Sequence, residues 1–173
     1  MNISYTKIDP AGNITVIVDS FVPREQQSRV ASELMKRDVT IEQVGFLEKP
    51  DDPCCAVRLQ MMGGEFCGNA SLSAAAVIFS RAGLGEGLYC EELFEVSGAP
   101  EPVKISGNMV NRACFEGEVA MPLPESISEC SFLDGFEGYT FPLVRFPGIC
   151  HAIVPAGAIN PERAEAVIAS WCR

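Results

Sequence analysis

The chain has 173 residues, of which 47% are hydrophobic, so it can bury a core as one globular domain or two small ones. Its 13 Lys and Arg residues against 23 Asp and Glu residues give a formal net charge of −10, which repels phosphate backbones and anionic lipid. No apolar run approaches the roughly 18 residues that span a bilayer, and the N-terminus does not resemble a signal peptide. We therefore expect a cytoplasmic protein that binds neither nucleic acid nor membrane.

The first 62 residues predict strands separated by turns, with one helix among them. The second strand is rich in β-branched residues, and Pro10-Ala11-Gly12-Asn13 before it is a turn signal. The helix places apolar residues on one face. The predicted strands are 3–8, 14–19, 44–48 and 55–62, and the predicted helix is 25–37.

The segment after Cys67 is apolar or small on every side and ends near Gly83. A helix with no polar face belongs in the interior of a protein. We therefore predict a central buried helix whose first turn begins at or just after Cys67, with strands wrapped around it.

The rest of the chain returns to short strands. A polar, proline-containing connection is predicted over 122–129, and Asn160-Pro161 is a typical helix start. Many short strands around one apolar helix favour the α+β class. The predicted strands are 93–96, 103–106, 113–121, 139–146 and 151–155, and the last helix runs from 160 through Trp171.

Eight cysteines occur, at positions 54, 55, 67, 90, 114, 130, 150 and 172, together with a single histidine. The chain is too long and too apolar for the class of small disulfide-rich secreted proteins. No C-x-x-C motif occurs, so we expect no zinc site of the usual ligand spacing. The prediction is reduced thiols, most of them small buried side chains.

Cys67 is the candidate for chemistry. Glycines at 63, 64 and 68 leave room for a ligand to approach the backbone. A helix N-terminus stabilises a thiolate, and its unpaired N–H groups bind carboxylates. Such a site could hold a substrate carboxylate and present a base to the α-carbon, which is what proton removal from an amino acid without a cofactor requires. The alternative is a structural cysteine ahead of a core helix.

The segment Gly64-Glu65-Phe66-Cys67-Gly68-Asn69-Ala70 resembles the first catalytic-cysteine motif of the diaminopimelate epimerase superfamily. These racemases and epimerases work without pyridoxal phosphate. Segments 5–13, 42–46, 96–98 and 119–122 resemble further motifs of the superfamily in the same order. The motifs at 10–13, 42–46 and 65–70 are closer to the histidine racemases of staphylopine-type metallophore synthesis than to diaminopimelate epimerase itself.

The resemblance implies two pseudo-symmetric domains, each with strands around a central helix, and an active site between them. A thiolate from one domain takes the α-proton and a thiol from the other returns one. Carried over to this chain, Cys67 is the base for one enantiomer, and the backbone N–H groups of Gly68 and Asn69 bind the α-carboxylate. Asn13 and Gln43 line the substrate pocket. The substrate is an amino acid or related carboxylate, with L-histidine the first to test, and neither cofactor nor metal is implied.

The second cysteine motif of the superfamily, Cys-Gly-Ser/Thr-Gly, does not occur in this chain. We therefore expect residues 1–112 to form the first epimerase-like domain and residues 113–173 an incomplete beginning of the second. Alone, such a chain would lack one of the two bases and would be inactive. The missing base would then lie in a missing C-terminal half. Alternatively, the open sheet edges and apolar surface of a half-built second domain would drive formation of a homodimer.

Other interpretations stay open from the residues alone. The protein could be an isomerase of a non-amino-acid carboxylate on the same fold, a carboxylate-binding domain without catalysis, or a redox thiol protein. His151 is either a partner of Cys67 in a thiol dyad or structural. Glu65 either tunes the site or is solvated, and Asn13 either contacts the substrate or supplies a left-handed turn conformation.

Overall fold

A computed structural model describes residues 2–131, 140–147, 149–154, 160–162 and 165–166. Contacts divide the chain into two compact units, Met1–Pro122 and Leu123–Arg173. The predicted boundary between residues 112 and 113 falls in the turn between β6 (Val103–Asn111) and β7 (Cys114–Val119), which pair antiparallel. The strand expected to open a second domain therefore completes the sheet of the first unit.

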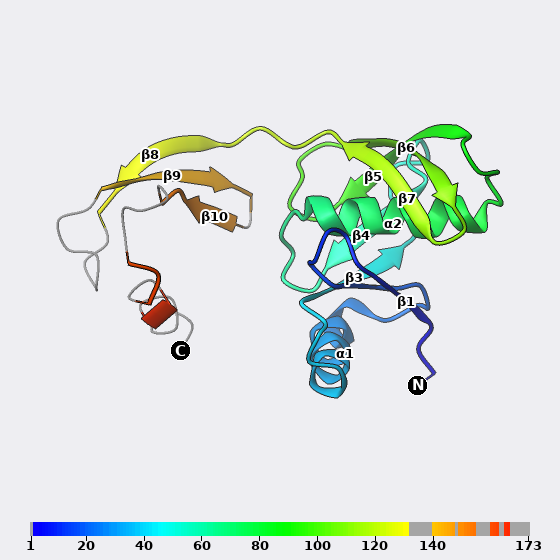
Figure 1. The fold of residues 1–173 in the computed structure, drawn as a ribbon, viewed down its shortest axis with the longest axis horizontal. Helices are drawn as coiled ribbons and strands as arrows, with labels where there is room; N and C mark the ends of the chain where they lie inside the picture. The colour runs from blue at the N-terminus through cyan, green and yellow to red at the C-terminus, as the bar shows by residue number, and fades with distance from the viewer. Residues whose placement is uncertain (1, 132–139, 148, 155–159, 163–164, 167–173) are drawn as a thin grey trace. The chain divides into compact units, whose positions relative to one another are not determined.

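The first unit combines a mixed seven-stranded sheet, with its strands in chain order, and two helices (Figure 1). Besides β6 and β7, its elements are β1 (Tyr5–Ile8), β2 (Thr15–Val18), α1 (Arg24–Arg37), β3 (Gln43–Glu48), β4 (Val57–Met61), α2 (Gly68–Arg81) and β5 (Tyr89–Val96). Neighbouring strands are antiparallel except for β2–β3 and β4–β5, which are parallel and are connected through α1 and α2 respectively.

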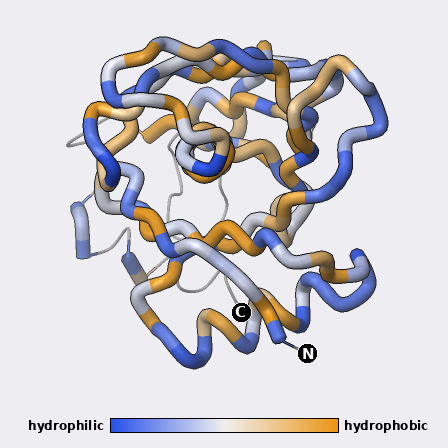
Figure 2. Tube along the Cα trace, turned by 90° about the vertical axis from the view of Figure 1, so that its right-hand side faces the viewer, coloured by the Kyte–Doolittle hydropathy of each residue, from blue (hydrophilic) through white to orange (hydrophobic). Residues whose placement is uncertain are grey.

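Alternation along β2 divides the interior into two apolar clusters. Val16 and Val18 pack with α1, whereas Ile17 between them packs with α2. This is the period of two that a strand imposes on its side chains. Seen along α2 in Figure 2, the sheet curls around the helix, so the second helix lies inside the curve.

The surroundings of α2 differ from the prediction of a helix buried on every side. Ala70, Ala74 and Phe79 are buried against the sheet, but Leu72 and Ala76 are only half-buried. These two side chains line an open cavity between the edges of the curled sheet. The small residues that predicted burial thus serve close packing on one side of the helix and an open surface on the other.

The second unit contains a three-stranded antiparallel sheet in the order β10–β9–β8. Its strands are β8 (Ser126–Cys130), β9 (Phe141–Phe146) and β10 (Ile149–Ala152). The prediction of a connection over 122–129 was wrong at β8, because pairing with β9 makes a strand of a mostly exposed, polar segment. At the predicted last helix, the Glu162 N–H donates to Asn160 Oδ1 at 2.9 Å, as an N-cap requires. Most of that helix, with Trp171, lies outside the described residues.

Within the described part of the chain, no helix has both the length and the apolar character needed to cross a membrane.

A charged cluster joins α1 to the sheet. Burial alone would raise the pKa of Glu48, but hydrogen bonds from Arg24 and Gln27, with the positive charges of Arg24 and Arg58, outweigh it and lower this pKa below its usual 4.5. The ionised carboxylate therefore stabilises the fold above pH 4.5, and this stabilisation is lost as the pH falls through the lowered pKa.

Glu48→Gln is expected to reduce the free energy of unfolding by about 1–2 kcal/mol at pH 7, since it weakens charge-assisted hydrogen bonds at a partly exposed site. The difference from the unmodified chain should narrow as the pH falls below 4.5. Urea unfolding at pH 7 and in acid measures both values. A difference that stays constant with pH would contradict the role given to the ionised carboxylate.

Candidate active site

Cys67 is the N-cap residue of α2, with extended backbone dihedral angles, and the helix begins at the next residue. Its Sγ accepts a hydrogen bond from the Ala70 N–H at 3.4 Å. The predicted helix start is confirmed. The thiol thus takes the capping position that Ser, Thr or Asp usually fills, next to the positive end of the helix.

Gln43 reaches the same sulfur from the sheet. Its Oε1 lies 3.0 Å from Cys67 Sγ, and its Nε2 lies 2.7 Å from Thr15 Oγ1. Thr15 Oγ1 in turn lies 3.0 Å from the Asn13 carbonyl oxygen. Three residues singled out in the sequence, Asn13, Gln43 and Cys67, are therefore linked by one chain of hydrogen bonds.

Thr15 is the member of this chain that the sequence did not indicate. It is fully buried, and in the parallel pair β2–β3 it stands opposite Gln43. In the sequence it is one more β-branched residue of a strand. The signal that could have found it is the alignment of two parallel strands that begin at Thr15 and Gln43.

The first turn of α2 offers donors to a ligand. The first four N–H groups of a helix have no partner within it. Ala70 donates to Cys67 Sγ and Ser71 to the Cys67 carbonyl oxygen. No described residue accepts from the N–H groups of Gly68 or Asn69, the two predicted to hold a carboxylate.

The side chain of Met121 packs close to Gly68. A Cβ added there would lie 3.2 Å from the Sδ of Met121. Met121 is itself 59% exposed, so an apolar, flexible side chain borders the start of the helix on the side of β7. The helix start is therefore bordered both by polar backbone donors and by an apolar thioether.

The two residues that follow β5 contact the loop that carries Cys67. Ser97 Oγ accepts the Met61 N–H and donates to the Glu65 carbonyl oxygen, both at 2.9 Å. Gly98, at φ +73°, packs directly against the backbone of Phe66. The Glu65 carboxylate lies beside Gly63. The position of Cys67 is therefore fixed by backbone and hydroxyl contacts.

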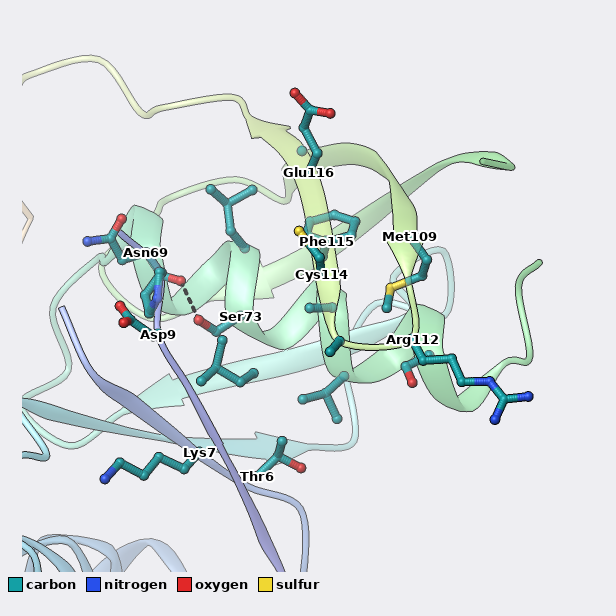
Figure 3. Close-up of a pocket in the computed structure, with 18 of the residues that line it drawn as sticks. Thr6, Lys7, Asp9, Asn69, Ser73, Met109, Arg112, Cys114, Phe115 and Glu116 are labelled. Carbon is teal, nitrogen blue, oxygen red and sulfur yellow. Dashed lines mark hydrogen bonds between the residues drawn. The ribbon is translucent and has the colours of Figure 1, made fainter. Parts of the chain in front are cut away.

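A separate cavity of about 760 Å³ lies along α2, and Figure 3 shows residues that line it. Thr6 and Lys7 of β1 border it on one side, and Arg112 and Cys114 at the β6–β7 turn border it on the other. Of the predicted site residues, all of which are described, only Asn69 lines it. The cavity is thus distinct from the hydrogen-bond chain at Cys67.

Positive φ in the β1–β2 loop falls on Ala11 and Gly12, so Asn13 does not supply a left-handed conformation. The Gly12 N–H donates to Asp9 Oδ1 and closes this loop. His151 lies exposed on β10 of the second unit, with its ring edge-on to Phe146 at 5.7 Å.

The seven cysteines of the described residues are free thiols. Over the same residues, no three His, Cys, Asp or Glu side chains are grouped as metal ligands.

The fold matches that of solved racemases and epimerases. A probable proline racemase from Agrobacterium radiobacter, solved with carbonate, superposes with a TM-score of 0.67 at 13% identity, over 98% of this chain and 57% of that one. A hydroxyproline epimerase from Agrobacterium vitis, solved with trans-4-hydroxy-L-proline, gives 0.66 at 12% identity, over 97% and 57%. The curled mixed α/β sheet therefore resembles the fold of these proline racemase and hydroxyproline epimerase structures.

Sequence comparison is more specific. The chain belongs to the family of the histidine racemase CntK N-terminal domain, whose profile matches residues 2–171. A histidine racemase of Staphylococcus aureus is 40% identical over 167 residues, covering 92% of this chain and 57% of that protein. One from Fusobacterium nucleatum is 34% identical over 158 residues, covering 87% and 54%. The resemblance to the N-terminal portion of histidine racemases is confirmed, and the chain spans little more than half the length of these relatives.

Proposed function

We propose that this chain is the Cys67-bearing part of a cofactor-independent amino-acid racemase, with histidine as its substrate. The observation that carries the proposal is Cys67 at the start of α2, with a hydrogen-bonded thiol beside two backbone N–H groups that donate to no described residue. The family and the names of its histidine racemase relatives supply the substrate.

In this proposal the α-carboxylate of the substrate binds the N–H groups of Gly68 and Asn69. This places the α-carbon next to Cys67 Sγ, which exchanges a proton with one face of it. The opposite face requires a second acid–base group. The resemblance to the superfamily assigns that group to the cysteine of a Cys-Gly-Ser/Thr-Gly motif, which this sequence does not contain, so in this proposal the group is supplied by another part of the protein.

The test uses the protein in the length its gene encodes. Incubated with L-histidine in D₂O, it should replace the α-proton with deuterium, seen by proton NMR, and form D-histidine, seen by chiral chromatography. Cys67→Ser should slow exchange by at least about 100-fold, the usual contribution of a positioned acid or base. Cys54→Ser, which changes an exposed cysteine, should leave the rate unchanged.

The outcomes separate the remaining interpretations. Exchange with another amino acid but not histidine would overturn the substrate and keep the chemistry. Binding of histidine without exchange would point to a carboxylate-binding domain. Full activity in Cys67→Ser would refute the role of this thiol.

A further inference from the structure

We infer that Thr15 is a positioning residue that orients the Gln43 amide and thereby keeps Cys67 protonated in the resting site. The inference starts from the direction of the hydrogen bonds between Asn13 and Cys67. It deepens the proposed function, because it states which proton transfer the resting thiol is prepared for.

The direction of the chain is fixed at one end by a group that cannot donate. The Asn13 backbone carbonyl only accepts, so Thr15 O–H donates to it across 3.0 Å. The hydroxyl has a single proton, so Thr15 Oγ1 must accept from its other partner at 2.7 Å. That partner is then Gln43 Nε2.

The amide therefore presents its oxygen to the sulfur. Gln43 Oε1 lies 3.0 Å from Cys67 Sγ and has no proton to give, so this contact is satisfied by the S–H of a thiol. A thiolate would face the negative end of the amide dipole at the same distance. The N–H of Ala70 on the other side favours a thiolate, so the Gln43 amide opposes the helix start.

The burial of Thr15 holds the side chains of Thr15 and Gln43 in this arrangement. Thr15 is fully buried, and its pairing with Gln43 across β2–β3 sets both side chains on the α2 face of the sheet. The ionisable side chains on the segments around Cys67 are Glu65, Glu42 and Asp9, and among the described residues none is hydrogen-bonded or ion-paired with Sγ. On β7 the residue packed against the helix start is the apolar Val119. The orienting hydrogen bonds therefore come from Thr15.

For catalysis, the arrangement assigns proton donation to Cys67 and proton removal to the second acid–base group. In the resting site Cys67 is the proton donor: the S–H bond breaks, its proton goes to the α-carbon, and the electron pair stays on sulfur as a thiolate. The substrate's own α-proton is removed from the opposite face by the second acid–base group of the proposed function.

The test measures alkylation of Cys67 by iodoacetamide against pH, in the 173-residue chain, without substrate. The tryptic peptide 59–81 contains Cys67 as its sole cysteine, so mass spectrometry follows this thiol among eight. Thr15→Val, nearly the same shape without the hydroxyl, should move the midpoint of the pH–rate profile down by about one pH unit, or about tenfold faster alkylation below the midpoint. Thr15→Ser, which keeps the hydroxyl, should retain the original midpoint.

Two results would overturn the inference. One is an unchanged midpoint in Thr15→Val, and the other is an equal shift in Thr15→Val and Thr15→Ser, which would assign the effect to packing. Because no racemisation is measured, a protein inactive toward every amino acid could still pass this test, so the two proposals fail separately.

A second measurement needs no Thr15 variant to fold. The infrared difference spectrum between the unmodified chain and Cys67→Ser at neutral pH should contain an S–H stretching band, displaced to lower wavenumber by donation to Gln43. The absence of that band would show a resting thiolate and would overturn the inference directly.

Discussion

Gly98→Ala is expected to lower the free energy of unfolding by about 2–4 kcal/mol, the sum of an unfavourable backbone conformation and overpacking. Gly98 has φ +73°, and a Cβ there would collide with the backbone of Phe66 and lie 2.6 Å from the carbonyl carbon of Glu65. These are backbone atoms that cannot swing aside, so the loop before Cys67 must move. Urea unfolding measures the loss.

Gly83→Ala is the matched control. Gly83 also has positive φ, at +68°, but a Cβ there meets nothing within 4 Å. Gly83→Ala should lower the free energy of unfolding by about 1–2 kcal/mol, which is the cost of the left-handed backbone conformation alone. An equal loss in both variants would show that contact with the Cys67 loop adds nothing. Gly98→Ala should also change the alkylation rate of Cys67, whereas Gly83→Ala should not.

Phe79→Ala is expected to lower the free energy of unfolding by about 3–5 kcal/mol, the range for truncating a buried aromatic side chain. Phe79 is 2% exposed on the sheet side of α2, and its ring meets Phe115 of β7 edge-on at 5.7 Å. The substitution leaves a void between the helix and the edge of the sheet. Thermal and urea unfolding measure the loss.

Phe21→Ala is the matched control, because it makes the same substitution at a side chain that is 83% exposed. It should change the free energy of unfolding by less than about 0.5 kcal/mol. Similar losses in the two variants would contradict the placement of Phe79 in the core that holds α2.

Local signals in the sequence were enough to locate the centre of the candidate site. Cys67, flanked by glycines and followed by a small-residue helix, was predicted as the residue before the helix and is its N-cap. Helix caps depend on a few neighbouring residues, so they can be recognised locally. Gln43 was indicated by resemblance, and its Oε1 lies 3.0 Å from Cys67 Sγ.

Elements decided by pairing were harder to predict. β5 begins at Tyr89, four residues before the predicted strand, because its polar first half pairs with β6. β8 was missed for the same reason, since a mostly exposed strand has no hydrophobic alternation to detect. Thr15 was overlooked because its function depends on which residue of a parallel neighbour lies opposite it.

The pairing of Thr15 with Gln43 also bears on how the chain folds. A shift of one residue between β2 and β3 would turn one of these side chains to the α1 face, and the amide would lose its orienting partner. In the inferred arrangement, the thiol of Cys67 is therefore hydrogen-bonded to Gln43 only after β2, β3 and α2, from three separate stretches of sequence, have aligned. During refolding, the moment at which alkylation of peptide 59–81 slows would date the docking of α2 onto a correctly registered sheet.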